Sequence, residues 1–175
     1  MVEHAFVTRL KELHHRNDRG ALAALRRGLG QPPGSVAQMH PYVARFLAEG
    51  PWNWRHQCHY ILAALYASHP ESIASGNFGD TFRKVEAAAG GDSIEKRFVA
   101  LLASHRDDLF DHLRQAVSLA SGKDIPICWE QLFFDIQHWD DDSGRVQREW
   151  SRSYWGGLPA GGASKESTNT IKIGE

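Results

Sequence analysis

Apolar residues recur three or four positions apart along most of the chain, and no segment alternates convincingly with a period of two. Phe6, Val7, Leu10 and Leu13, for example, fall on one face of a helix over residues 5–15. This spacing is typical of amphipathic α-helices, whereas half-buried strands show the shorter period. Helices are predicted at residues 5–15, 18–29, 35–47, 54–67, 80–89, 93–102, 109–121, 126–136 and 145–154. We therefore predict an all-α fold of about eight to nine helices.

Capping and helix-breaking residues set the expected ends of these helices. Asn17 or Asp18 can cap the second helix, and Gly30 is expected to end it. Ser35 can open the third helix. Pro41 within that helix predicts either a kink or a helix that starts there with proline in its first turn.

The loop at residues 69–79 contains glycine and serine and divides the predicted helices into two groups. We expect an N-terminal helical bundle over residues 1–68 and a C-terminal bundle over residues 80–155, packed together. Residues 156–175 are rich in glycine, serine and lysine, and we predict a disordered tail there. The N-terminus lacks the apolar core of a signal peptide, and the apolar runs are too short to cross a bilayer. These features predict a cytoplasmic protein with no membrane contact.

The formal net charge is −1, but the charges are unevenly distributed. Residues 1–60 carry eight lysine or arginine residues against four acidic ones. Such asymmetry permits a basic face on a nearly neutral molecule. Arginine also outnumbers lysine fourteen to six, and its planar guanidinium suits phosphate well. A GC-rich genome would produce the same excess of arginine.

Histidine and aspartate supply the candidate metal ligands. His56 and His59 lie three residues apart, so they share one helical face, as a ligand pair would. No carboxylate or second ligand pair accompanies them at a defined spacing, and we favour ordinary packing. The carboxylates of DDDSG at residues 140–144 do not converge on one ion, and they predict a helix break and a cap for the last helix. Because HExxH, GxSxG, P-loop and GxGxxG motifs are absent, we predict no catalytic residue, metal or cofactor.

Basic residues placed at helical intervals form the remaining pattern. Gathered on one surface, they would follow a phosphate backbone without reading bases. The alternative is a set of solvated helix faces with local ion pairs, and the spacing alone leaves both interpretations open. The residues concerned are Arg55, Arg83, Lys84, Arg97, Arg106 and Arg114.

Several segments together resemble one protein family, the small helical CasB subunit of the type I-E CRISPR surveillance complex, Cascade. The resemblance covers residues 5–155 and rests on the order and spacing of its motifs. The segments are NDRGALAALRRGLG, PYVARFL, WNWRHQCHYILAALYA, SIEKRFVALLASHRDDLFDHLRQAVSLA and CWEQLFFDIQHWD.

The resemblance implies a non-enzymatic all-α protein of two helical bundles, two copies of which pack head to tail within the complex. Its expected partners are the CRISPR RNA, the target DNA with its displaced strand, and the large and backbone subunits of Cascade. The implied function is to hold the nucleic-acid backbone and so stabilise the R-loop in antiviral defence, while guide pairing supplies sequence specificity.

Carried over by motif, the implied nucleic-acid-binding residues are all basic. Arg83 is the register alternative to Lys84, and Arg145 and Arg148 follow acidic residues where the family pattern has more cations. Adjacent helical residues diverge by roughly 100°, so we expect one of Arg26 and Arg27 to face nucleic acid and the other its edge or a partner. The full set is Arg26, Arg27, Arg55, Arg83, Lys84, Arg97, Arg106, Arg114, Arg145 and Arg148.

Two other hypotheses compete with this one. The first is a small metal-dependent helical enzyme that uses His56 and His59 with a third histidine. The second is a helical adaptor without nucleic-acid contact, whose arginines pair with acidic partner proteins.

Overall fold

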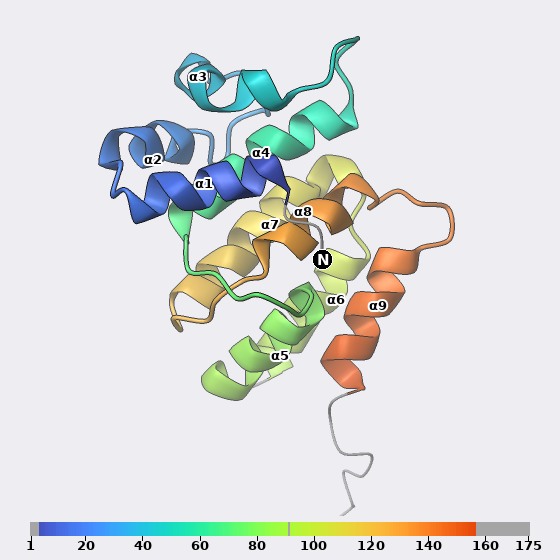
Figure 1. Ribbon diagram of the computed structural model, residues 1–175. Helices are drawn as coiled ribbons and strands as arrows, with labels where there is room; N and C mark the ends of the chain where they lie inside the picture. The colour runs from blue at the N-terminus through green and yellow to red at the C-terminus, as the bar shows by residue number, and fades with distance from the viewer. Residues whose placement is uncertain (1–3, 91, 157–175) are drawn as a thin grey trace, which may run out of the picture.

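A computed structural model describes residues 4–90 and 92–156 of the chain (Figure 1). Within these ranges the structure contains nine α-helices and two short 3₁₀ helices, which confirms the all-α prediction. The α-helices are α1 (Ala5–His15), α2 (Arg19–Arg26), α3 (His40–Val43), α4 (Trp54–Ser68), α5 (Phe78–Ala89), α6 (Asp92–Leu102), α7 (Arg106–Ser121), α8 (Trp129–Gln137) and α9 (Arg145–Trp155). The 3₁₀ helices are η1 (Ala37–Met39) and η2 (Ala44–Phe46).

Helix α4 forms the centre of the core because its sequence is apolar on every side. Residues 58–67 are all buried, and α4 packs against α1, α2, α7 and α8 (Figure 1). Its start is fixed by a capping box, in which the Asn53 side chain accepts from the His56 N–H and the His56 ring accepts from the Asn53 N–H. A helix that is apolar all round is typical of a fully buried position.

Helices α5 and α9 form the closest pair of neighbours in the second half of the chain. An aromatic cluster fills the space between them and α6, with Phe78 and Phe82 from α5, Phe98 from α6, and Trp150 and Tyr154 from α9. Neighbouring ring centroids in this cluster lie 4.4–5.6 Å apart, a spacing that favours tilted and edge-to-face pairs.

Two helices near the N-terminus differ from the sequence prediction. Asp18 caps α2 as expected, but α2 ends at Arg26 rather than near Leu29. Residues 27–30 continue as tight turns with i,i+3 hydrogen bonds, which do not sustain an α-helix. Of the two alternatives for Pro41, a helix with proline in its first turn is confirmed, because α3 spans His40–Val43. One continuous helix over 35–47 is wrong, since 3₁₀ turns flank α3.

Two other predicted helix starts and one predicted cap need correction. Helix α5 begins at Phe78, because Asn77 supplies a capping box with Asp80. Helix α8 begins at Trp129 rather than at residue 126, since Ile127 forms an isolated bridge with Ser72. The residue at the N-cap of α9 is Gly144 in a left-handed conformation with no side-chain hydrogen bond, so the predicted aspartate cap is wrong.

The proposed division into two bundles stays a prediction. Helix α8, assigned to the second bundle, packs against α1 and α4 of the first, and Lys11 forms an ion pair with Glu130 between α1 and α8. The predicted tail lies outside the described residues apart from Gly156. In the described ranges, no helix has the length and apolar character to span a membrane.

Candidate nucleic-acid interface

One face of α7 carries a stripe of residues that spans most of the helix. Arg106, Phe110, Arg114 and Ser118 are spaced four residues apart, so each lies about one turn above the last and the stripe winds gradually around the helix. All four take part in lining two depressions between α7 and the first half of the chain. A rise of 1.5 Å per residue separates Arg106 from Arg114 by about 12 Å along the helix axis.

The larger depression, which we call the α7 pocket, has a volume of about 410 Å³. It joins α7 to Arg97 of α6, to Ser68 at the end of α4 and to Leu29 after α2. Two of the predicted basic residues, Arg97 and Arg114, therefore meet in one cavity although seventeen positions separate them in the chain. The complete lining is Leu29, Ser68, Arg97, Arg114, Gln115, Ser118, Leu119 and Ser121.

Arg26 lies beside the same pocket. Its Nε donates a 2.9 Å hydrogen bond to the carbonyl oxygen of Ala67, and the next residue, Ser68, lines the cavity. This bond leaves the outer nitrogens of the guanidinium available for a ligand. Arg27 is exposed, and its side chain makes no hydrogen bond to any residue that the structure describes. The structure thus gives the two adjacent arginines different surroundings.

Arg106 lines the second depression, of about 300 Å³, with Asp107 and Asp111. Arg106 Nη1 lies 3.0 Å from Asp140 Oδ2 and its Nε lies 3.8 Å from Asp107 Oδ1. Such solvent-exposed ion pairs contribute about 0–1 kcal/mol each, so a phosphate can compete for the guanidinium. The neighbouring carboxylates nevertheless lower the positive potential at this end of α7.

The α7 pocket differs from the second depression because none of its eight lining residues is acidic. Arg114 contacts Asp111 at 3.5 Å, but both side chains are about half exposed or more, and water screens the pair. No described carboxylate lies within ion-pair distance of Arg97. Two guanidiniums that line a cavity without acids create a site suited to an anion.

The other predicted basic residues lie elsewhere on the molecule. Arg55 is exposed in the first turn of α4, and Lys84 is exposed on α5. Arg83 is bound to Asp80 at 3.4 Å within α5. Arg145 and Arg148 lie on α9. Arg145 contacts Glu149 at 3.2 Å, and Arg148 donates to the carbonyl of Ser143. Of the ten, Arg97 and Arg114 line the α7 pocket, and Arg26 is bonded to Ala67, next to the lining residue Ser68.

Sequence reasoning missed the uncharged polar residues of the pocket. Ser68, Gln115, Ser118 and Ser121 carry no motif, and each is an ordinary residue of a helix surface. One signal was present, since Ser118 continues the four-residue spacing from Arg106 through Arg114.

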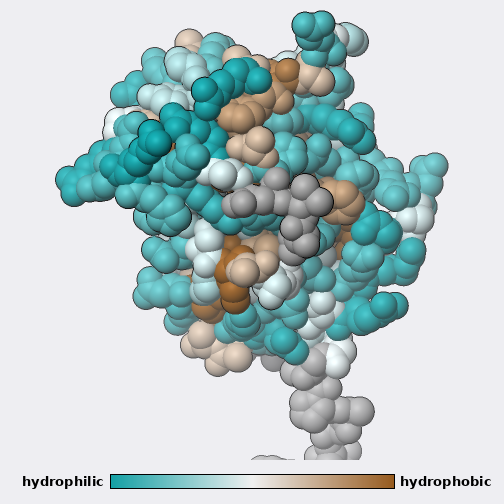
Figure 2. Space-filling model, viewed as in Figure 1, coloured by the Kyte–Doolittle hydropathy of each residue, from teal (hydrophilic) through white to brown (hydrophobic). Residues whose placement is uncertain are grey.

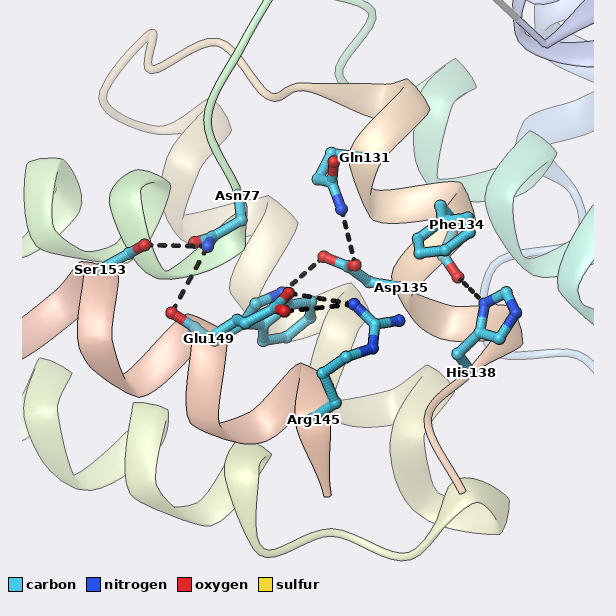
Figure 3. A network of polar contacts seen from close by, with 9 residues as sticks. Asn77, Gln131, Phe134, Asp135, His138, Arg145, Glu149 and Ser153 are labelled. Carbon is cyan, nitrogen blue, oxygen red and sulfur yellow. Dashed lines mark hydrogen bonds and ion pairs between the residues drawn. The ribbon is translucent and has the colours of Figure 1, made fainter. Parts of the chain in front are cut away.

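A buried polar network between α8 and α9 was also not predicted (Figure 3). Asp135 is 1% exposed, and its carboxylate accepts 2.7 Å and 2.8 Å hydrogen bonds from Trp150 Nε1 and Gln131 Nε2. Burial raises the pKa of Asp135 to about 6, although both hydrogen bonds favour the charged form. On the adjoining surface, Asn77 donates 2.8 Å to Ser153 Oγ, and Arg145 binds Glu149. Every charged group of this network has its partner within the chain.

The two histidines considered as metal ligands are engaged in packing. His56 accepts from the Asn53 N–H through Nδ1, and its Nε2 lies 2.9 Å from the Ala48 carbonyl oxygen. His59 Nδ1 lies 2.8 Å from the Arg55 carbonyl, its ring packs against Phe6 and Phe133, and burial lowers its pKa. Among residues 4–90 and 92–156, no group of three or more His, Cys, Asp or Glu side chains is placed to hold a metal ion.

Known proteins share both the sequence pattern and the fold. The family model of CRISPR-associated protein Cse2 matches residues 21–155. A CRISPR-associated protein Cse2 of Thermus thermophilus is 40% identical over 157 residues, which cover 87% of this chain and 86% of the relative.

Solved structures agree with these matches. The crystal structure of a Cse2-family protein from Thermus thermophilus has a TM-score of 0.77 and 36% identity, over 86% of this chain and 96% of that chain. A chain of a CRISPR RNA-guided surveillance complex has a TM-score of 0.73 and 28% identity, over 86% of this chain and 89% of that chain.

Proposed function

This chain belongs to the CRISPR-associated Cse2 family, and we propose that it is a non-catalytic small subunit of a Cascade-type CRISPR surveillance complex. A similar chain from a CRISPR RNA-guided surveillance complex supports this assignment. In the proposed complex the protein contacts the guide RNA, the target DNA and the displaced strand through their backbones, and so stabilises the R-loop. Base pairing with the guide then carries the sequence specificity.

The α7 pocket is the observation that supports nucleic-acid contact most directly. Arg97 and Arg114 line it, Arg26 lies at its edge, and no acidic residue is part of its lining. A guanidinium binds a phosphate with two parallel hydrogen bonds, whereas a backbone contact of this kind reads no base. The remaining partners in the proposal are the large and backbone subunits and a second copy of this chain, packed head to tail.

Two double variants with the same change in charge test the proposal. Replacing both Arg97 and Arg114 by glutamine removes two cations from the pocket, whereas Arg145→Gln with Arg148→Gln removes two from α9. We expect the first pair to weaken binding of a single-stranded oligonucleotide on the order of 30-fold at low salt, because two charge-assisted hydrogen bonds are lost. The second pair should change binding little, since its guanidiniums bind groups of the chain itself.

The salt dependence of binding gives an independent measure in the same titration. Each phosphate contact to a single strand contributes about 0.7 to the slope of log K against log salt. The variant with Arg97→Gln and Arg114→Gln should therefore lose about 1.4 from that slope. Circular dichroism and thermal unfolding of both variants check that the helical fold is retained.

Each competing hypothesis makes a different prediction. A protein that acts only as an adaptor for acidic protein partners would show no oligonucleotide binding even at low salt. A metal-dependent enzyme would be purified with a stoichiometric metal ion, which elemental analysis detects. Equal losses in the two double variants would instead show that the binding site is wrongly assigned.

A further inference from the structure

The α7 pocket has more space and a more varied lining than a phosphate group requires. Its volume of about 410 Å³ lies within the range of small-ligand pockets, roughly 300–1,000 Å³. Four segments contribute to its wall: the turn after α2, the end of α4, helix α6 and helix α7. Because secondary-structure elements in the core of the fold hold these segments, the cavity exists before any ligand arrives.

The lining combines three kinds of side chain that recognise different parts of a nucleotide. Arg97 and Arg114 suit the phosphate, and their planar groups can also stack on a base. Leu29 and Leu119 offer the apolar surface against which an unstacked base packs. Amides and hydroxyls both donate and accept hydrogen bonds, so they pair with the edge of any base. These groups come from Gln115, Ser68, Ser118 and Ser121.

The polar groups of the pocket are largely free for a ligand. Ser68 Oγ donates to the Leu65 carbonyl within its own helix, which leaves its lone pairs as acceptors. Gln115, Ser118 and Ser121 have no side-chain hydrogen bond to another residue of the described ranges. In the α8–α9 network, by contrast, the polar side chains bond to one another, as Asp135 does with Gln131 and Trp150.

We infer that the α7 pocket binds one unpaired nucleotide, with its phosphate at Arg97 and Arg114 and its base against Leu29, Leu119 and Gln115. This inference rests on the proposed function and adds to it a preference for an unpaired strand over a duplex. In a duplex the bases are paired and stacked, so only the backbone reaches the arginines. An unpaired strand, such as the displaced strand, can place a base in the pocket as well, and it gains the corresponding contacts.

A substitution that fills the pocket without changing its charge separates the base contact from the phosphate contact. Ser118 is exposed on α7, so Ser118→Trp should leave the fold intact while occupying the cavity. We expect this variant to bind a single-stranded homopolymer about tenfold more weakly than the unmodified chain, and a duplex of the same length equally well. Ser93→Trp is the matched control, because it adds the same ring to an exposed helical serine outside the pocket lining; its single-strand affinity should stay within about twofold.

Small probes test the same site directly. In nuclear magnetic resonance titrations of the full chain, a nucleoside 5′-monophosphate should shift the amide signals of Ser118, Leu119 and Ser68. Inorganic phosphate should shift these signals more weakly, and Ser118→Trp should abolish the response to the nucleotide.

The possible outcomes distinguish this inference from the proposed function. If Ser118→Trp weakens single-strand and duplex binding equally, or if the nucleotide binds no better than inorganic phosphate, the pocket holds only backbone phosphate and the inference is wrong. The proposed function survives that result as long as binding still depends on Arg97 and Arg114. If the unmodified chain binds neither strand form at low salt, both proposals fail.

Discussion

The α7 pocket and the α8–α9 network both gather arginines and polar groups, but they use them in opposite ways. At α9, Arg145 is held by Glu149 (Figure 3), and its guanidinium lies 5.3 Å from the centre of the Phe134 ring. Arg148 donates to the carbonyl of Ser143. At α7, Arg97 and Arg114 line an open cavity in which no carboxylate is found among the described lining residues.

The difference shows how to separate structural from functional cations in a helical protein. A guanidinium that already has a carboxylate and an aromatic ring as neighbours stabilises its own helix, and a ligand has to displace those contacts. At the pocket, Arg97 has no described carboxylate within ion-pair distance, and Arg114 has only the exposed, water-screened contact with Asp111 at 3.5 Å, so an incoming anion has less to displace. The surface elsewhere is mostly hydrophilic, with small separate apolar areas on the face that Figure 2 presents. Trp52, Val99 and Phe134 are the large apolar side chains most exposed among the described residues.

The largest effect is expected at Gly79, where α5 and α9 touch through their backbones. A methyl group on Gly79 would lie 2.8 Å from the carbonyl carbon of Trp150 and closer still to its oxygen. Because backbone atoms cannot turn aside, Gly79→Ala should force α9 away from α5 and disturb the bond from Trp150 to Asp135. We expect a loss of about 3 kcal/mol in the free energy of unfolding, measured by urea denaturation.

A second helical glycine provides the control on the other side of the molecule. The methyl group of Gly20→Ala in α2 would meet only Asp18 Oδ1, at an ordinary 3.6 Å. This substitution should raise the free energy of unfolding by about 0.5–1 kcal/mol, because alanine loses less conformational entropy on folding. If Gly79→Ala is as stable as the unmodified chain, the close packing of α5 on α9 is wrong.

Most of the helices were predictable because they bury an apolar face with a clear helical period. Phe6, Val7, Leu10 and Leu13 are all buried, and α1 has its predicted bounds. The boundaries failed where local turn chemistry decided the structure. Arg26 and not Leu29 ends α2, and Gly144 precedes α9 in place of an aspartate cap. A hydrophobic pattern does not contain that information.

The candidate site was predictable only as a set of charges. The spacing and the family resemblance named Arg26, Arg97 and Arg114, but nothing in the sequence indicated that Arg97 and Arg114 would line one cavity or that Arg26 would be bonded next to its Ser68 wall. Their meeting depends on how α2, α4, α6 and α7 pack. The burial of Asp135 was not predicted, because the sequence pattern is that of an ordinary surface carboxylate on an amphipathic helix. Its burial follows from tertiary packing with Trp150.

The next effect concerns pH, and it distinguishes the closed network from the open pocket. The pKa of Asp135 is about 6 in the folded protein, above its ordinary value. The folded chain therefore holds more protons than the unfolded chain between about pH 4 and pH 6, and the contribution of Asp135 to stability falls as the pH rises through that window. Above about pH 6 Asp135 is charged in the folded protein, and its burial lowers the stability of the fold by the full amount. Below about pH 4 the carboxyl is protonated in both states, so this penalty is absent.

Asp135→Asn should remove this dependence while keeping both hydrogen bonds. The new amide can accept from Trp150 and donate to Gln131 once the Gln131 amide turns over. We expect the variant to be more stable than the unmodified chain by about 2 kcal/mol near pH 7 and equally stable near pH 4, measured by urea unfolding across that range.

Asp141 is a control of opposite sign for this experiment. Hydrogen bonds from the backbone and side chain of Ser143 lower the pKa of this exposed carboxyl, so its charged form stabilises the fold at neutral pH. Relative to the unmodified chain, Asp141→Asn should therefore become slightly less stable as the pH rises, whereas Asp135→Asn becomes more stable. If the free energy of unfolding changes with pH in the same way in Asp135→Asn and in the unmodified chain, Asp135 is not buried as a charged group.

The smallest effect separates the two adjacent arginines at the edge of the pocket. Lysine keeps the charge of arginine but lacks its fork, so it cannot both bind the Ala67 carbonyl and hold a phosphate with parallel bonds. Arg26→Lys should weaken oligonucleotide binding about threefold, whereas Arg27→Lys should leave it unchanged, because the Arg27 side chain has no hydrogen bond to a described residue for lysine to lose. Fluorescence anisotropy at low salt resolves this difference. A larger loss at Arg27 would mean that the outward guanidinium makes the oriented contact, and that the hydrogen bond to Ala67 holds Arg26 for the fold alone.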